Sequence, residues 1–111
     1  MKDTSYKIED FSVEIYAKDM KGGRTRWADK IIRLYSQGRE VGQAVFAQEK
    51  TKAPEPYLSG DVIYYFAEST QFPAVMDLLR NEKNVYIGWK PVFDPKEPND
   101  GDALFFSKPS E

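Results

Sequence analysis

A run of cations and aromatic rings between Lys18 and Arg39 holds the residues best suited to bind a ligand. Seven Lys or Arg residues fall in this run, against two acidic residues, Asp19 and Asp29. Lys and Arg side chains can follow the phosphates of a nucleic acid while aromatic rings stack on unpaired bases. The sequence therefore offers single-stranded nucleic acid as a candidate partner, bound by Lys21, Arg24, Arg26, Trp27, Lys30 and Arg33.

The charge of the whole chain weakens this hypothesis. The net charge is −2, with ten Lys or Arg against eight Asp or Glu in residues 1–50 and six against ten in residues 51–111. A nucleic-acid-binding domain usually carries a strong basic footprint, and no RNP-type motif is present. Tyr and Trp are also favoured in strands for reasons of packing. The alternative is that this segment is a solvated hairpin.

The composition argues against catalysis. The chain contains no His and no Cys, which removes the usual general base, the thiolate nucleophile and the commonest metal ligands. Ser59 stands in Tyr-Leu-Ser-Gly and not in a G-x-S-x-G elbow, and neither phosphate-binding glycine motif occurs. We expect no enzyme and no cofactor. The remaining enzymatic alternative is carboxylate or lysine chemistry in an aromatic pocket, which requires a cleft with displaced pKa values.

An acidic loop over residues 94–102 could gather oxygen ligands for Ca²⁺. It does not match the EF-hand pattern. When Gly101 is aligned with the invariant glycine, Lys96 and Pro98 occupy ligand positions and Ser107 replaces the bidentate Glu. We interpret the loop as a solvated turn and expect no metal.

Aromatic residues gather in the second half of the chain. They could line a pocket for an apolar ligand, but aromatic side chains also dominate the packing of small domains. We expect them to fill the core. They are Tyr64, Tyr65, Phe66, Tyr86, Trp89, Phe105 and Phe106.

The elements that must position these residues begin with three strands. Residues 11–17 alternate apolar and polar positions, which places Phe11, Val13, Ile15 and Ala17 on one inward face. Gly22 and Gly23 then predict a hairpin to a strand over 25–35. A turn at Gln37-Gly38 leads to a strand over 40–47, with Leu34 opposite Val41, Tyr35 opposite Glu40, Arg33 opposite Gly42 and Ile31 opposite Ala44. Neither face of this pair is cleanly apolar, so we expect a bulge near Ile31-Ile32.

One helix is predicted in the second half. Residues 48–60 form an exposed connection, and residues 61–67 are apolar enough to be the centre of the sheet. Phe72, Val75, Met76 and Leu79 recur at helical spacing, Ser69 or Thr70 can cap the first turn, and Pro73 is tolerated there. Strands over 85–89 and 103–107 follow, with Val85, Ile87 and Trp89 on one side.

The predicted fold is a single α+β domain over residues 1–111. An antiparallel sheet of about six strands, in the order β-β-β-β-α-β-β, is packed by one amphipathic helix. The longest apolar run, residues 62–67, is too short to span a membrane, and no signal-peptide pattern opens the chain. The absence of Cys fits a reducing compartment, so we expect a cytoplasmic protein.

These features favour a non-enzymatic binding or protein-interaction module. A small antiparallel sheet leaves open edges that invite pairing, and aromatic residues are enriched at interfaces. We therefore expect self-association as a homodimer. Single-stranded nucleic-acid binding is the alternative function, and an enzyme without His or Cys chemistry is the third.

Overall fold

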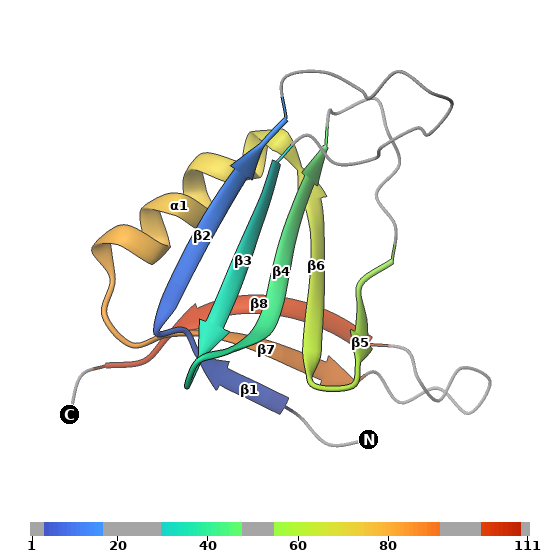
Figure 1. Ribbon diagram of the computed structural model, residues 1–111, viewed down its shortest axis with the longest axis vertical. Coiled ribbons are helices and arrows are strands. Elements are labelled where there is room, and N and C mark those ends of the chain that lie inside the picture. The colour runs from blue at the N-terminus through green and yellow to red at the C-terminus, as the bar shows by residue number, and fades with distance from the viewer. Residues whose placement is uncertain (1–3, 17–29, 48–54, 92–100, 110–111) are drawn as a thin grey trace.

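The computed structural model describes residues 4–16, 30–47, 55–91 and 101–109. Within these ranges the chain is mostly strands, with one α-helix, as the α+β prediction requires (Figure 1). The strands are β1 (Thr4–Lys7), β2 (Asp10–Ile15), β3 (Lys30–Ser36), β4 (Arg39–Ala47), β5 (Tyr57–Ser59), β6 (Val62–Glu68), β7 (Val85–Pro91) and β8 (Gly101–Ser107). A 3-10 turn, η1 (Ser69–Gln71), leads into the helix α1 (Phe72–Asn81).

The strands form two sheets instead of the single sheet expected. A five-stranded sheet has the order β2-β3-β4-β6-β5, and a three-stranded sheet has the order β1-β7-β8. The two strands that the sequence analysis missed are β1, four residues long, and β5, three residues long. Segments this short cannot display a repeating apolar pattern, which is why about six strands were expected and eight are described.

The N-terminal segment belongs to both sheets. The Ile8 N–H donates to the Val85 carbonyl at the start of β7 (2.8 Å), and the next N–H, that of Glu9, donates to the Tyr35 carbonyl of β3 (2.9 Å). The chain thus bends between β1 and β2 and changes its partner sheet at that bend. Such corners are typical of two packed sheets whose strands run in different directions. Here β7 and β8 cross behind β3 and β4 (Figure 1).

The β3–β4 hairpin contains a bulge, three residues from where it was predicted. Gln37 and Gly38 both have positive φ (53° and 79°), as a tight hairpin turn requires, and Tyr35 lies opposite Glu40 as expected. The register then shifts between Leu34 and Tyr35. Gly42 therefore lies opposite Leu34, a place predicted for Val41.

The physical reason for this position of the bulge is burial. The shift leaves Val41 fully buried as the extra residue, while Leu34 and Ile32 of β3 lie opposite the buried residues Gly42 and Ala44. The other predicted pairs move with it: Arg33 lies opposite Gln43, and Ile31 opposite Val45.

The strand predicted to be central, β6, lies next to the centre, which is β4. It runs parallel to β4, so the sheet is mixed and not purely antiparallel. The cause is the short strand β5, which pairs antiparallel with β6 through a turn in which Gly60 has φ +59°. Because β5 reverses the chain once more, β6 returns in the direction of β4.

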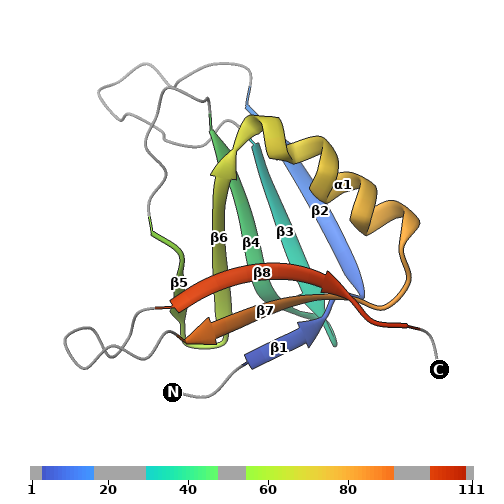
Figure 2. The same ribbon diagram turned by 180° about the vertical axis from the view of Figure 1, so that it is seen from behind.

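The helix packs as its apolar stripe predicted. Val75 and Met76 are buried, while Phe72 and Leu79 pack against the core from its margin. The Phe72 ring meets the Phe46 ring edge-on, with 5.3 Å between centroids. Figure 2 shows α1 and the three-stranded sheet sharing one face of the five-stranded sheet.

The predicted start of the helix was wrong in one respect. Gln71 is the N-cap residue, and no side chain caps the first turn, because Ser69 and Thr70 belong to the preceding 3-10 turn. Pro73 lies in the first turn as expected. At the other end Asn84 takes a positive φ of 58°, which turns the chain into β7.

The aromatic cluster that was expected to be core divides between two environments. Trp89 is 1% exposed between the layers, and Tyr65 meets Phe105 edge-on beside it, with 4.9 Å between centroids. The register places the remaining four rings on the opposite faces of their strands. They are Tyr64, Phe66, Tyr86 and Phe106.

The packing of the Trp89 ring against Gly101 predicts a strict requirement for glycine at position 101. A Cβ on Gly101 would lie 2.7 Å from Trp89 Cε2 and 2.8 Å from the Lys90 carbonyl oxygen. Gly101→Ala should therefore lower the free energy of unfolding by about 1 to 3 kcal/mol through overpacking. Urea denaturation measures this loss. Ser59→Ala, at the exposed end of β5, is the control and should stay within about 0.5 kcal/mol of the parent.

Burial of Tyr65 predicts a loss of stability at alkaline pH. Burial raises the pKa of Tyr65, with a smaller contribution from Asp102. An unfolded Tyr ionises near pH 10. Ionisation therefore favours the unfolded chain, and the stability from neutral Tyr65 is complete below that pH and lost as the pH rises further.

The Tyr65→Phe variant should accordingly lose less stability than the parent between about pH 9 and pH 11. Urea midpoints across this range measure the difference. Tyr57→Phe, at a half-exposed ring on β5, is the control. Parallel losses in the parent and Tyr65→Phe would contradict the assignment.

Candidate interaction site

The structure describes two of the six residues predicted to bind nucleic acid. Lys21, Arg24, Arg26 and Trp27 lie outside the described residues. Lys30 and Arg33 are both on β3, but an odd spacing places them on opposite faces of the sheet. The Lys30 ammonium lies 5.5 Å from the Phe72 ring centroid on the helix side. The structure therefore does not bring these two cations together, and nucleic-acid binding stays a prediction.

Arg33 is held by two carboxylates. Its Nε lies 2.5 Å from Glu14 Oε1, and its Nη1 lies 3.4 Å from Glu40 Oε1. The hydrogen bond to Glu14 raises the pKa of Arg33, against a smaller opposing effect of burial. Glu40 also accepts a hydrogen bond from the Gln43 amide (2.6 Å). This guanidinium is consequently neutralised within the sheet and poorly placed to meet a phosphate.

These residues lie on the outer face of the five-stranded sheet, which faces the viewer in Figure 1 and carries neither α1 nor the three-stranded sheet. One cross-strand row runs over it through Tyr57, Tyr64, Gln43, Arg33 and Ser12. Tyr57 and Tyr64 stack at 4.4 Å between centroids, and burial raises the pKa of Tyr64. The row is thus aromatic at one end and polar at the other.

Substitution of Arg33 tests whether the outer face takes part in nucleic-acid binding. If the chain binds single-stranded oligonucleotides, Arg33→Gln should change the affinity less than twofold, because Glu14 and Glu40 already neutralise this cation. Fluorescence anisotropy with a labelled oligonucleotide at low and moderate salt measures it. The combined variant Lys21→Gln, Arg24→Gln is the comparison. If these two residues contact phosphates, their loss should weaken binding and reduce its dependence on salt concentration. A tenfold loss on Arg33→Gln would show that the ion pairs open for a ligand.

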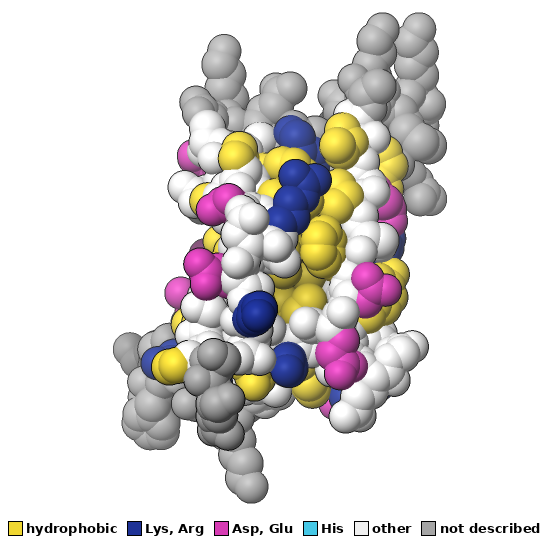
Figure 3. Space-filling view, turned by 90° about the vertical axis from the view of Figure 1, so that its left-hand side faces the viewer, with side chains coloured by type: hydrophobic (Ala, Val, Ile, Leu, Met, Phe, Trp, Pro, Cys, Tyr) yellow, Lys and Arg dark blue, Asp and Glu magenta, His cyan; other side chains and the backbone are white. Residues whose placement is uncertain are grey.

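A second surface is an open groove of about 690 Å³ between β2 and α1. Figure 3 shows hydrophobic side chains along this side of the molecule, with Lys and Arg side chains lying over them. The groove is lined by Val13, Ile15, Phe72, Pro73, Met76, Asp77, Arg80 and Asn81. We call this surface the β2–α1 groove.

The apolar side chains of β2 are the main exposed apolar feature of the groove. Val13 lies opposite Ile32 and so points toward the helix side, as predicted. Nevertheless Val13 is 37% exposed and Ile15 is 66% exposed. The sequence pattern gave their direction correctly, but the position of α1 leaves them uncovered. Ala17, predicted on the same face, lies outside the described residues.

The backbone of β2 presents hydrogen-bonding groups beside this groove. Among the described strands β2 pairs with β3 on one side and is the last strand of its sheet on the other. The Phe11 N–H donates to the neighbouring Asp10 carboxylate (2.8 Å) in an exposed position and therefore points away from β3. Because backbone groups alternate along a strand, those of Val13 and Ile15 point to the same free edge.

A polar rim closes the helix side of the groove. The Asn81 amide donates to the Asp77 carboxylate one turn earlier, so these two side chains satisfy each other. Arg80 lies in the last turn of α1, where a cation interacts favourably with the helix dipole. The groove therefore combines an apolar floor, a free strand edge and a mixed polar rim.

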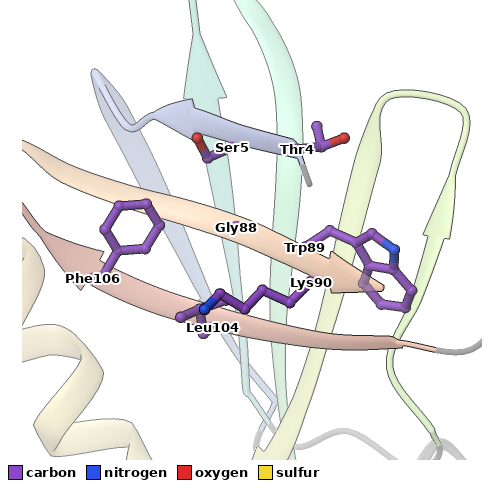
Figure 4. A pocket seen from close by; sticks show the side chains of 7 residues that line it. All are labelled: Thr4, Ser5, Gly88, Trp89, Lys90, Leu104 and Phe106. Carbon is purple, nitrogen blue, oxygen red and sulfur yellow. The ribbon is translucent and has the colours of Figure 1, made fainter. Parts of the chain in front are cut away.

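A third surface is a shallow hollow of about 290 Å³ on the outer face of the three-stranded sheet. It lies over Gly88 of β7, where the strand has no side chain (Figure 4). Phe106 and Leu104 of β8 bound it on one side, and Ser5 of β1 bounds it on the other. The sequence analysis did not single out Gly88, since a lone glycine in a strand carries no ligand signal.

No group of three or more His, Cys, Asp or Glu that could hold a metal occurs within the described ranges, and most of the acidic loop over 94–102 lies outside them. The helix that the structure describes is too short to cross a bilayer, in agreement with the expectation that no helix spans a membrane. No family model, curated protein or solved structure matches the chain.

Proposed function

We propose that this chain is a protein-interaction module that binds an extended segment of a partner polypeptide in the β2–α1 groove. The observation that carries the proposal is the edge of β2 with which no described strand pairs, beside exposed apolar side chains. Addition of a strand to an exposed sheet edge is a recurring mode of peptide recognition. It needs no cofactor and no catalytic residue.

The backbone provides one half of the interaction. An added strand would lie about 4.8 Å from β2 and bond to the outward N–H and C=O groups of alternate residues. Val13 and Ile15 supply these groups, since their parity matches that of Phe11. Main-chain bonds of this kind give affinity with little dependence on the partner's sequence.

The side chains provide the other half. Every second side chain of an added strand would point into the groove, toward Phe72 and Met76 on α1 and beside Val13 and Ile15 on β2. Burial of apolar surface is worth about 25 cal/mol per Å². Partner segments with apolar residues at alternate positions are therefore favoured over helical or uniformly polar ones.

The predicted homodimer remains a second form of the same interaction. In both ribbon views α1 runs past the β2 edge (Figures 1 and 2). A symmetric pairing of β2 with β2 of a second copy would press the two helices against each other. This consideration favours an extended segment over a folded copy as the occupant.

Peptide display can test the proposal. Selection from a random peptide library on the immobilised protein should enrich sequences with apolar residues at alternate positions. Ile15→Thr should weaken the enriched peptides by about tenfold, because the lost contact lies in the groove. The fold should survive, since Ile15 is 66% exposed. The matched control is Ile31→Thr, which makes the same change on β3, on the face of the sheet that points away from the groove.

Amide hydrogen exchange gives an independent readout of strand addition. A bound peptide should slow exchange at Val13 and Ile15, whose N–H groups point to the free edge, and leave Ser12 and Glu14 unchanged, since theirs point to β3. Equal slowing at all four residues, or equal binding by the Ile15→Thr variant, would contradict the proposal. If Ile15→Thr abolishes peptide binding and also dissociates a dimer, as measured by light scattering, a second copy of the chain is the occupant.

A further inference from the structure

The hollow on the outer face of the three-stranded sheet has Gly88 at its base. On the outer face of β7, Gly88 lies between Tyr86 and Lys90, which point the same way. A Cβ added at Gly88 would lie 3.0 Å from Phe106 Cε1 and 3.5 Å from Leu104 Cδ2. The missing side chain therefore lets Phe106 and Leu104 approach the buried Gly88 backbone and form one wall of the hollow.

The wall formed by Phe106 is held in place before any ligand arrives. Phe106 stacks on Tyr86 with 5.3 Å between centroids and 10° between planes. The Lys108 ammonium lies 4.6 Å from the Tyr86 centroid and 5.9 Å from that of Phe106, and Lys108 does not line the hollow. A site arranged in advance loses less entropy on binding.

The hollow also carries a cation at its rim. Figure 4 shows the Lys90 side chain lying along the sheet with its ammonium over Leu104. Asp102 is the cross-strand partner of Lys90, but its carboxylate accepts a hydrogen bond from the Ala103 N–H (2.9 Å). In the part of the chain that the structure describes, no ion pair joins Lys90 to a carboxylate.

We infer that this hollow binds a small aromatic carboxylate, independently of the β2–α1 groove. The ring lies against the wall formed by Phe106 and Leu104, with its edge toward the Phe106 ring, an arrangement that aromatic pairs favour. The carboxylate meets the Lys90 ammonium, and the Ser5 hydroxyl borders the same space from β1. The volume of about 290 Å³ limits the ligand to one ring with a short acidic arm.

Titration with 3-phenylpropanoate, followed by nuclear magnetic resonance of backbone amides, tests the inference. We expect shifts at Gly88, Lys90 and Leu104 that saturate in the millimolar range. Two comparison compounds separate the contributions: 3-phenylpropanol keeps the ring without the charge, and propanoate keeps the charge without the ring. Both should bind at least about tenfold more weakly than 3-phenylpropanoate.

Two lysine variants provide a matched pair. Lys90→Met keeps the apolar stem and removes the charge, and it should weaken 3-phenylpropanoate about tenfold. Lys108→Met removes a cation that is already engaged by Tyr86 and should change the affinity less than twofold. Both positions are exposed, so neither change should unfold the chain.

Gly88→Ala places a methyl group in the hollow and should abolish the saturable shifts. If that variant fails to fold, the Lys90→Met and Lys108→Met pair still decides the question. Equal binding of 3-phenylpropanol and 3-phenylpropanoate, equal effects of the two lysine variants, or shifts spread over the whole chain would overturn the inference. Peptide binding in the β2–α1 groove would be unaffected by any of these outcomes, since the two surfaces share no lining residue.

Discussion

The close approach of the two sheets is the constraint on which the rest of the structure depends. Gly42 of β4 meets the Ile87 side chain of β7, and a Cβ there would lie 2.8 Å from Ile87 Cδ1 and 3.2 Å from the Ile63 carbonyl oxygen. Gly101 of the neighbouring strand β8 leaves room for the Trp89 ring in the same way. Because neither glycine carries a side chain, Ile87 and Trp89 can be buried almost completely between the layers.

This crossing determines which surfaces stay open. The three-stranded sheet and α1 share one face of the five-stranded sheet (Figure 2), and they leave Val13 and Ile15 of β2 partly exposed. The opposite face carries an internal network in which Arg33 is bound by Glu14 and Glu40. Its one described cation is already neutralised, so the open strand edge offers the stronger basis for recognition, through backbone groups and apolar contact.

Short elements explain most of what the sequence could not reveal about the fold. The β5 strand, only Tyr57–Ser59, reverses the chain and makes β6 parallel to β4. The bulge at Val41 shifts the β3–β4 register so that Leu34 meets Gly42. Neither feature has a repeating pattern, because both satisfy long-range burial and not local propensity. The β2–α1 groove was not predicted for a related reason. Val13 and Ile15 alternate with polar residues as core residues do, and this alternation is the same whether or not a helix covers them.

The sequence by itself determined the α+β class, the helix that carries Val75 and Met76, and the inward side of β7, because periodicity records which side of an element is apolar. Only the tertiary structure decided how many sheets form, that β1 and β2 share one bent segment, and that Val13 and Ile15 stay exposed beside α1. Those outcomes depend on contacts between residues far apart in the chain. A local pattern states that a side chain is apolar, but the packing of distant elements decides what covers it.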